Sequence, residues 1–384
     1  MKIMIIGAGL GGLTAAIALR QQGINVEVHE AASKLEETGA GLTLGLGAQH
    51  VFRALGLQNA VAEQACPAGT LPFLHYQNAR LLMGDFDRGD GRADDGEANI
   101  VRHIYRADLQ QVLIDALKEL GGPVFTRHKL ADFHDSGDQV TAVFANGDTA
   151  TGDLLIGADG VRSAVRAILW PDDAPRFTNH VAYRFLVPMA QARPFMDLGR
   201  SAIFIGPQRT FNRYTMCNGD IVNCAGLAET TEAVPEGWSI GASESELAEA
   251  FSGWHEDVVG LIGHASNIIK WGLYDRQPLA TWTRGRTTLL GDAAHAMLPF
   301  LGMGAAMAIE DGYILAKTLG LGTDWEQALQ RYEAARKPRT EQVHAASIIQ
   351  GKVTQAIDPD RFEPASAPMN NMDMMAFDPV TAPL

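Results

Sequence analysis

The chain has 384 residues, of which 46% are hydrophobic and 20% are charged, and its formal net charge is −14. This length and balance are typical of a globular protein with two closely packed lobes. The negative charge argues against a nucleic-acid partner, which normally meets a basic face, and no apolar run reaches the roughly 18 residues of a membrane-spanning helix.

The cysteines and the first residues predict a cytoplasmic protein. Cys66, Cys217 and Cys224 show no CxxC or metal-ligand spacing, so we expect reduced thiols and no metal site. The chain opens directly on a predicted strand, which leaves no room for a signal peptide. We therefore expect the protein in the cytoplasm.

The first thirty residues predict a binding site for a dinucleotide. The apolar run Ile3–Ile6 leads into a glycine-rich turn and a helical segment, and the strand-like segment Val26–His29 then ends at Glu30. This order of strand, glycine turn, helix, strand and acid is the dinucleotide-binding fingerprint. Glu30 can accept hydrogen bonds from a ribose hydroxyl. The fingerprint by itself does not choose between FAD and NAD.

Three glycines of this turn have separate tasks. Gly7 permits the tight turn, Gly9 leaves room for the pyrophosphate, and Gly12 lets the helix pack closely on the strand. The amino terminus of the helix offers free N–H groups to the phosphates. The alternative is a turn that binds nothing, because a chain with 40 glycines holds glycine clusters by chance.

The next hundred residues mix loops, helices and a hairpin. We expect a glycine-rich loop over 38–44, a short helix over 48–56 and an acidic, glycine-rich surface loop over 84–99. A helix opens at Arg106 and ends at Gly121-Gly122.

Two patterns then follow each other along the chain. Val140–Phe144 and Thr149–Thr151, joined through Asn146-Gly147, predict a β-hairpin that leads into the buried strand Leu154–Ile156. From about 175 to 275 the chain changes to short β-like runs such as Ala182–Val187 and Ala202–Ile205. These runs predict a separate, sheet-rich lobe.

The last third of the chain returns to the first pattern. A buried strand over Thr287–Leu290 precedes a glycine turn, and a helix is expected from about Gly304 to Leu319. Nucleotide-binding segments therefore stand at both ends of the chain. We predict a discontinuous cofactor domain of residues 1–175 and 276–345, a β-rich substrate domain of 176–275 and a C-terminal tail of 346–384.

Three segments in this order resemble the single-component (group A) FAD-dependent aromatic hydroxylases. They are the fingerprint with Glu30, the segment Asp159–Arg166 (DGVRSAVR) and the segment Gly291–His295 (GDAAH). The resemblance covers residues 1 to about 340, and Tyr274–Asp311 is most similar to the branch of salicylate hydroxylase, 3-hydroxybenzoate 6-hydroxylase and 6-hydroxynicotinate 3-monooxygenase. It implies an α/β fold, with a Rossmann-like FAD-binding domain (GR2-type, PHBH-like) and an inserted β-sheet-rich substrate domain.

The resemblance implies further FAD contacts beyond the fingerprint. Asp292 is implied to bind FAD, with a helix N-cap as the alternative. Gly302, Met303 and Gly304 precede a helix, so their N–H groups can face a flavin carbonyl. Arg106 resembles the family arginine that contacts the phosphate or ribose region of FAD.

Asp159 resembles the family aspartate that helps to hold FAD and the nicotinamide donor, and Arg166 is implied to pair with it. The alternative interpretation of Asp159 is that Asp159-Gly160 simply forms a turn. The chain contains a single GxGxxG. The resemblance therefore implies that NADH or NADPH binds transiently, without a Rossmann domain of its own.

The implied activity is that of an NAD(P)H-dependent FAD monooxygenase acting on a small phenolic or N-heteroaromatic acid. NADH or NADPH reduces FAD, O₂ adds to give a flavin C4a-hydroperoxide, and an electron-rich ring receives one oxygen atom. The protein must exclude water and hold the ring close. The alternatives are an FAD-dependent epoxidase, N-hydroxylase or reductase on the same scaffold, and a flavin-binding protein without enzymatic activity.

Candidate substrate contacts lie in the inserted domain and before the last predicted helix: Tyr183, Arg184, Thr210, Tyr214 and residues 297–303. Relatives carry a histidine four positions before the tyrosine, where this chain has Thr210, which can hydrogen-bond but is no base near neutral pH. Tyr214 is implied to orient the substrate, with an ordinary strand tyrosine as the alternative, and Pro299 matches the family proline near the flavin. We interpret His295 as structural. Leu46-Gly47 stands where relatives often carry Pro-Asn.

Overall fold

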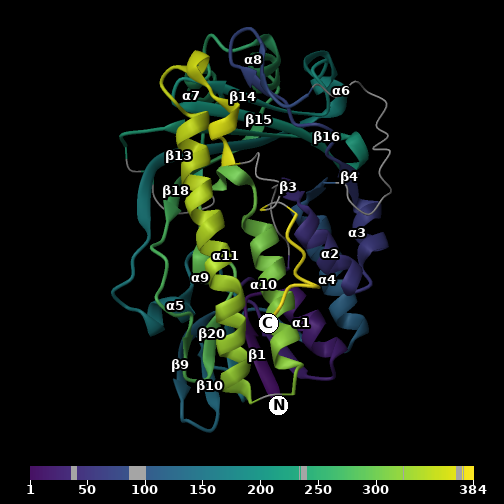
Figure 1. Ribbon diagram of the computed structural model, residues 1–384, viewed down its shortest axis with the longest axis vertical. Coiled ribbons are helices and arrows are strands. Elements are labelled where there is room, and N and C mark those ends of the chain that lie inside the picture. Colours follow the sequence, from purple (N-terminus) through teal and green to yellow (C-terminus); the bar gives the residue numbers. More distant parts are fainter. Residues whose placement is uncertain are drawn as a thin grey trace.

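The computed structural model describes residues 1–35, 41–85, 101–232, 234, 240–322, 324–368, 374 and 376–384. The loops expected over 38–40 and 86–99 lie outside the described residues. Two large sheets stand at opposite ends of the molecule, and two long helices, α10 (Gly304–Leu319) and α11 (Trp325–Thr354), run beside them (Figure 1).

The lower sheet has six strands in the order β19-β20-β12-β1-β2-β8. Their bounds are β1 (Lys2–Ile6), β2 (Asn25–His29), β8 (Val124–Phe125), β12 (Leu154–Gly157), β19 (Thr283–Arg284) and β20 (Thr287–Leu289). All pairs are parallel except the β19–β20 pair at the edge. The chain reaches β2 and β8 on one side of β1, and β12 and β20 on the other. Such a reversal of strand order is where parallel sheets bind ligands, at the carboxyl ends of the strands.

Both faces of the lower sheet are covered, as the apolar and buried central strands β1 and β12 require. The Ile5 side chain lies against Gly12 of α1 (Leu10–Gln21), whereas Met4 lies against Gly152 on the opposite face. Helix α1 packs against α10 and α4 (Arg106–Glu119). The meander of β9 (Leu130–Asp135), β10 (Val140–Phe144) and β11 (Thr149–Gly152) covers the face on which Met4 lies.

The upper sheet has eight strands in the order β17-β18-β13-β16-β15-β14-β5-β6. Their bounds are β5 (Phe73–His75), β6 (Leu81–Met83), β13 (Arg176–Pro188), β14 (Ser201–Gly206), β15 (Arg209–Met216), β16 (Ile221–Glu229), β17 (Ile240–Gly241) and β18 (Ser266–Asp275). The outer face carries α6 (Met189–Ala192), α7 (Glu244–Ala250) and α8 (Glu256–Ile262) (Figure 1). The substrate-domain limits of 176–275 stay a prediction, but this sheet also takes two strands from residues 73–83.

A small third sheet, β3-β7-β4, lies between the two large ones (Figure 1). The remaining elements are β3 (Gly41–Leu44), β4 (Ala65–Pro67), β7 (Arg102–Tyr105), α2 (Leu46–Ala54), α3 (Gln58–Gln64), α5 (Ala164–Leu169) and α9 (Asp292–His295). Short 3₁₀ turns are η2 (Arg193–Phe195), η3 (Cys217–Gly219), η4 (Pro299–Leu301), η5 (Pro359–Arg361) and η6 (Pro364–Ser366).

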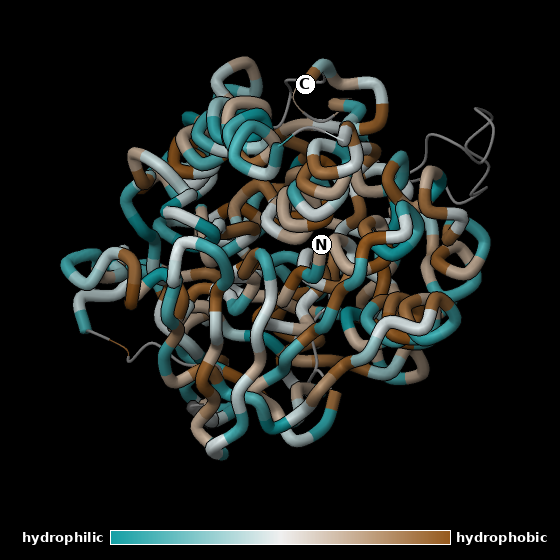
Figure 2. The backbone as a smooth tube through the Cα atoms, turned by 90° about the horizontal axis from the view of Figure 1, so that it is seen from below, coloured by the Kyte–Doolittle hydropathy of each residue, from teal (hydrophilic) through white to brown (hydrophobic). Residues whose placement is uncertain are grey.

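Local sequence signals mark several elements correctly. The predicted helices appear as α2, α4 and α10, and the predicted hairpin appears as β10 and β11. Gly121 and Gly147 both have positive φ, +68° and +93°, as their places after a helix and in a hairpin turn require. Within the described ranges, no helix is both long and apolar enough to cross a membrane. Hydrophobic and hydrophilic stretches alternate along the chain (Figure 2).

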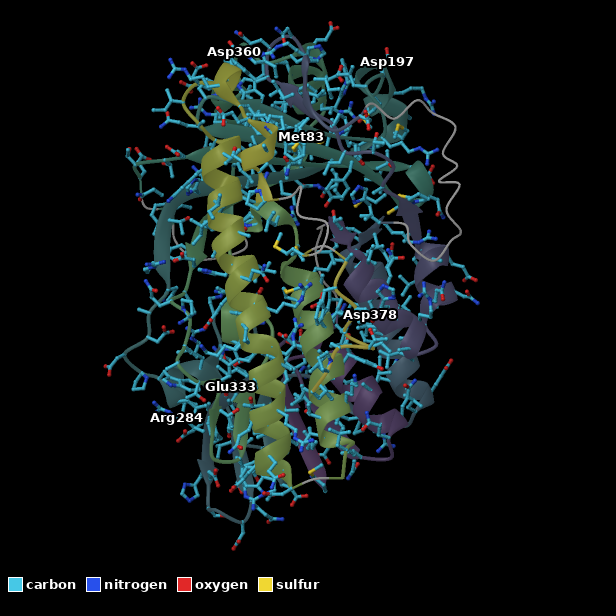
Figure 3. The ribbon with its side chains drawn as sticks, in the orientation of Figure 1. Met83, Asp197, Arg284, Glu333, Asp360 and Asp378 are labelled. Carbon is cyan, nitrogen blue, oxygen red and sulfur yellow. The ribbon has the colours of Figure 1, made fainter. Side chains whose placement is uncertain are left out.

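The C-terminal region ties the two ends of the molecule together. Helix α11 runs through residue 345, where the sequence predicted the end of the cofactor domain. After α11, Asp360 pairs with Arg80 of the β5–β6 hairpin, and Asp378 lies lower, in the part of the chain that passes α10 (Figure 3). There the Phe377 ring lies 4.0 Å from the Arg339 guanidinium. The residues after α11 therefore contact the β5–β6 hairpin of the upper sheet as well as helix α11 beside the lower sheet.

Candidate functional site

Four predicted cofactor contacts follow the carboxyl ends of neighbouring parallel strands. Gly7 follows β1, Glu30 follows β2 and Asp159 follows β12. Asp292 begins α9, three residues after β20 ends at Leu289. Since the strands are parallel, these segments meet at one edge of the sheet, next to the reversal beside β1.

The three fingerprint glycines differ in what surrounds them. A Cβ at Gly7 would lie 2.4 Å from the Ala158 carbonyl oxygen, and the φ of Gly7 is +108°. A Cβ at Gly12 would lie 2.3 Å from the Gly7 oxygen, whereas a Cβ at Gly9 would have nothing within 4 Å. Gly7 and Gly12 are thus required by packing. The open space at Gly9 fits the close approach of a pyrophosphate.

Glu30 and Gln110 hold the fingerprint turn from two sides. Glu30 Oε2 accepts a hydrogen bond from the Ala8 N–H at 2.8 Å, and Gln110 Nε2 donates to the Ala8 carbonyl at 2.9 Å. The Glu30 carboxylate keeps further lone pairs for a ribose. Gln110 escaped the sequence analysis, although it lies one helical turn after Arg106.

Arg106 faces charges from both large domains. Burial lowers the pKa of Arg106, the Asp292 carboxylate opposes that shift, and the Arg184 guanidinium adds to it. These side chains come from α4, α9 and β13. Asp292 is exposed, and its Oδ1 lies 3.9 Å from where a Cβ of Gly304 would stand. The Arg106 guanidinium therefore lies where α4, α9 and β13 meet, near one carboxylate and one further cation.

Asp159 caps a helix. Its Oδ2 accepts hydrogen bonds from the Ala164 and Val165 N–H groups at 2.7 and 3.2 Å, and its Oδ1 accepts one from the Ser163 hydroxyl at 2.5 Å. Burial raises the pKa of Asp159, and these hydrogen bonds oppose the shift. Its contact with FAD stays a prediction.

The implied pairing of Arg166 with Asp159 is wrong. Arg166 Nε donates to Asp173 Oδ2 at 2.7 Å, and its Nη1 donates to the carbonyls of Ala293 and Ala294 at 3.1 and 2.9 Å. Asp159 is already occupied by the first amides of α5, and Arg166 lies beyond them on the helix. Arg166 therefore joins the DG segment to the Gly291–His295 turn.

Asp311 of α10 organises that turn. Its Oδ2 accepts a hydrogen bond from the Gly291 N–H at 2.9 Å and lies 2.6 Å from His295 Nε2, while its Oδ1 accepts one from Arg336 Nε at 2.6 Å. Burial alone would raise the pKa of Asp311, but His295 and Arg336 lower it to about 2. This pairing agrees with a structural role for His295.

The loop before α10 exposes Pro299 and buries its neighbours. Pro299–Leu301 form the 3₁₀ turn η4, Gly302 has a φ of +66°, and Met303 is the N-cap of α10. No side chain caps α10, nor α1 at the fingerprint. Two uncapped helix amino termini, with the space at Gly9, fit a cofactor that has a pyrophosphate and a ring carbonyl, as FAD has.

Two neighbouring substrate candidates lie on opposite faces of the upper sheet, because successive strand residues alternate. The Tyr183 hydroxyl donates to Glu246 of α7 at 3.0 Å, on the outer face. Tyr183 is therefore not a substrate contact, contrary to the prediction. Arg184 lies on the inner face, toward the cofactor domain.

The inner face brings together residues of three neighbouring strands. The register places Arg184 and Asn212 on either side of Ala225, and Tyr214 opposite Asn223. Thr210, four residues before Tyr214, lies on the same face and is buried. This face meets β3, where a Cβ on Gly41 would lie 2.7 Å from the Tyr214 hydroxyl oxygen.

His103 of β7 lies behind Tyr214 and was missed by sequence reasoning. The two rings stack with centroids 4.2 Å apart. His103 Nε2 lies 3.1 Å from Ser201 Oγ, which itself donates to the Ala68 carbonyl, so Nε2 is the donor and Nδ1 accepts from the Thr43 hydroxyl. Burial lowers the pKa of His103 to about 4. No local pattern reveals such a contact between distant strands.

His103 is expected to make the protein acid-sensitive. An unfolded histidine binds a proton near pH 6.5 and the folded one only near pH 4, so the unfolded state holds the extra proton between these values. Stability therefore falls as the pH drops through that window, by up to about 3 kcal/mol. Urea unfolding at pH 7 and pH 4.5 should show a smaller pH effect in His103→Gln than in the wild type.

The exposed His134 supplies the matched control, because His134→Gln should leave the pH effect unchanged. Burial also lowers the pKa of His29 to about 4. His29 is present in every variant, so each variant should retain part of the pH effect. Equal pH effects in His103→Gln and the wild type would contradict this assignment.

Comparison with known proteins agrees with this geometry. The family model described as "FAD binding domain" matches residues 1–347. The chain is 34% identical to the 3-amino-4-hydroxybenzoate 2-monooxygenase PtnB3 of Streptomyces platensis, over 91% of this chain and 87% of the relative. It is also 34% identical to the 6-hydroxynicotinate 3-monooxygenase of Pseudomonas fluorescens, over 90% of each chain.

A solved salicylate hydroxylase substrate complex superposes with a TM-score of 0.82 at 24% identity, over 99% of this chain and 96% of that one, which shows a shared fold. The expected α/β fold with its FAD-binding domain is thus confirmed. The chain belongs to the FAD-binding-domain family of FAD-dependent aromatic monooxygenases.

Proposed function

We propose that this protein hydroxylates a small phenolic or N-heteroaromatic acid, with NADH or NADPH as reductant and O₂ as oxidant. FAD, when bound at the carboxyl edge of the lower sheet, would supply the redox chemistry that links the two. The relatives compared above are named for an aminohydroxybenzoate and a hydroxynicotinate. Both names describe aromatic acids, which supports the substrate class.

Arg184 carries the proposal. Its Nε is buried without a hydrogen-bond partner, and among the described residues no carboxylate forms an ion pair with it. Its guanidinium lies 5.5 Å from the Trp271 ring centroid, and burial lowers its pKa. The side chain is half-buried, so part of the guanidinium can still meet a ligand. A guanidinium matches a carboxylate with two parallel hydrogen bonds. We infer that the carboxylate of the substrate binds there.

The remaining residues would orient the ring and exclude water. Leu227, Leu298 and Phe300 form an apolar cluster where the sheet meets the loop before α10. Phe300 is held against Gly351 of α11. Such a cover keeps water from an oxygen-transfer site. Burial raises the pKa of Tyr214 to about 12, so its phenol stays protonated and can donate a hydrogen bond to the substrate.

Arg184→Met is expected to raise the KM for the aromatic acid by about 100-fold, because it removes a bidentate, charge-assisted hydrogen bond at a half-buried site. FAD content should stay unchanged. Steady-state NAD(P)H oxidation over a panel of hydroxybenzoates, aminobenzoates and hydroxynicotinates measures the change, with oxygen incorporation traced by isotope-labelled O₂. Arg361→Met, at a side chain that is 86% exposed, is the control.

Two outcomes would count against these assignments separately. If the wild type turns all consumed O₂ into hydrogen peroxide across the panel, it is not a hydroxylase of aromatic acids. If it hydroxylates one of them while Arg184→Met keeps the wild-type KM, Arg184 does not bind the carboxylate.

We also propose a cytoplasmic location. The reaction would draw on NADH or NADPH, and the three cysteines are free thiols, as expected in a reducing compartment.

A further inference from the structure

The inner face of the upper sheet holds a cluster of unmatched polar atoms. Four buried atoms there have no hydrogen-bond partner: Arg184 Nε, Thr210 Oγ1, Asn212 Oδ1 and Asn223 Nδ2. Buried polar atoms of native proteins normally have a partner, in the protein or outside it. Atoms from three adjacent strands on one face therefore indicate a polar ligand with several hydrogen-bonding groups.

Two of these atoms differ in chemical character. The Gly41 N–H donates to Asn223 Oδ1 at 3.1 Å. This bond fixes the orientation of the Asn223 amide, so its free group is the Nδ2 donor. Asn212 presents the opposite character, since its unmatched atom is the carbonyl oxygen. The face thus offers one neutral donor and one neutral acceptor beside the Arg184 cation.

The register also indicates how a ring would lie on this face. Arg184 pairs with Ala225, and Ala225 pairs with Asn212 on the other side. Backbones two strands apart are separated by about 10 Å. Ala225 is only half-buried and has the smallest side chain of the row. An aromatic ring can therefore lie over Ala225, with its carboxylate at Arg184 and a substituent on its far side at Asn212.

Neither amide can remove a proton. Thr210, Asn212 and Asn223 are neutral, and both ring nitrogens of His103 are engaged with hydroxyl groups. A carbonyl acceptor such as Asn212 Oδ1 selects a group that carries a hydrogen without ionisation: an amino group, a hydroxyl group or a ring N–H. A methoxy group offers no hydrogen to it.

Resting on the proposed function, we propose that Asn212 and Asn223 determine substrate specificity. Asn212 Oδ1 accepts a hydrogen bond from an amino, hydroxyl or ring N–H group across the ring from the carboxylate bound by Arg184. Asn223 Nδ2 donates to an oxygen substituent on the ring edge nearer Tyr214. The selected substrate is an aromatic acid with a neutral hydrogen-bond donor on the side of the ring away from its carboxylate.

The test compares binding to the FAD-loaded enzyme for three matched probes: 4-aminobenzoate, 4-hydroxybenzoate and 4-methoxybenzoate. Binding is followed by the change that each probe causes in the flavin absorbance spectrum, independently of turnover. The wild type should bind the amino or hydroxyl compound at least 10-fold more tightly than the methoxy compound. Asn212→Leu, which keeps the side-chain size, should abolish that preference.

Asn223→Leu should weaken 3,4-dihydroxybenzoate by about 10-fold and leave 4-hydroxybenzoate unchanged, because only the first compound has an oxygen substituent on the ring edge nearer Tyr214. Asn25→Leu makes the same chemical change at an exposed position that opens β2, and should alter nothing. FAD content and the thermal unfolding midpoint of each variant show whether it is folded.

The two levels of the proposal fail in different ways. If no aromatic acid perturbs the flavin spectrum of the wild type or becomes hydroxylated, the proposed function fails. If the wild type hydroxylates an aromatic acid but Asn212→Leu keeps the wild-type preference for donor substituents, or weakens all three probes equally, the specificity role is overturned while the function stands.

Discussion

Asp311→Asn is expected to lower the free energy of unfolding by about 3–5 kcal/mol, the usual cost of breaking a buried ion pair. The amide has one acceptor oxygen where the carboxylate has two, so Arg336, His295 and the Gly291 N–H cannot all keep their partner. Arg336 is fully buried and would keep an uncompensated part of its charge. Chemical denaturation measures the loss.

The same substitution should weaken FAD binding, because Asp311 holds the turn that carries Asp292. Titration of the apoprotein with FAD, followed by flavin fluorescence, measures that effect separately from stability. Asp115→Asn, at an exposed site on α4, is the control. An Asp311→Asn variant with wild-type stability and FAD affinity would show that the buried network does not support the turn.

Asp311 also predicts the behaviour of the protein in acid. Its pKa of about 2 lies below its ordinary value of 3.8. The unfolded state therefore binds a proton first as the pH falls, and the contribution of Asp311 is present above about pH 4 and lost toward pH 2. The acid sensitivity of His103 lies at higher pH, so the two effects occupy separate windows.

Gly9→Ala and Gly12→Ala are expected to have different effects: the first weakens FAD binding and the second lowers the stability of the protein. The backbone of Gly9 is extended, with φ −72° and ψ 175°, and its missing Cβ points into empty space. Alanine there should leave the apoprotein as stable as the wild type, while its methyl group blocks the pyrophosphate and raises the Kd for FAD by about 100-fold, or 2.7 kcal/mol.

At Gly12 the methyl group would meet the Gly7 oxygen at 2.3 Å and must push α1 away from the turn. Gly12→Ala should therefore lose stability even without FAD, by about 1–3 kcal/mol as for other overpacked sites. Unfolding of the two apoproteins in urea separates the cases. If Gly9→Ala binds FAD as the wild type does, the pyrophosphate does not pass over Gly9.

Motifs with a local cause were read correctly from the sequence. The helix over Gly304–Leu319 and the hairpin around Asn146-Gly147 depend on periodicity and turn chemistry within a few residues. The family was also recognisable, because three short motifs occur in a specific order along the chain. Each motif follows a strand of the same sheet, and the order of these strands along the chain can be predicted from the sequence.

The errors concern contacts between distant segments. Arg166 was expected beside Asp159 but pairs with Asp173, because the direction of a side chain from a short helix depends on what packs against it. Tyr183 was expected in the site but lies on the outer face of its sheet. The alternation of side chains along a strand already predicts that Tyr183 and Arg184 point to opposite faces. Which of the two faces is the inner one depends on the positions of α7 and the cofactor domain.

The sequence by itself determined the cofactor fold, the family and the strand ends at which FAD would bind, since these follow from local patterns and their order. Only the tertiary structure decided which polar groups meet: Gln110 on the fingerprint turn, His103 behind Tyr214, and Asn212 and Asn223 beside Arg184. Such contacts join strands that are remote in sequence, and their register and facing depend on the packing of both sheets. The substrate side of the site is therefore a property of the assembled sheets.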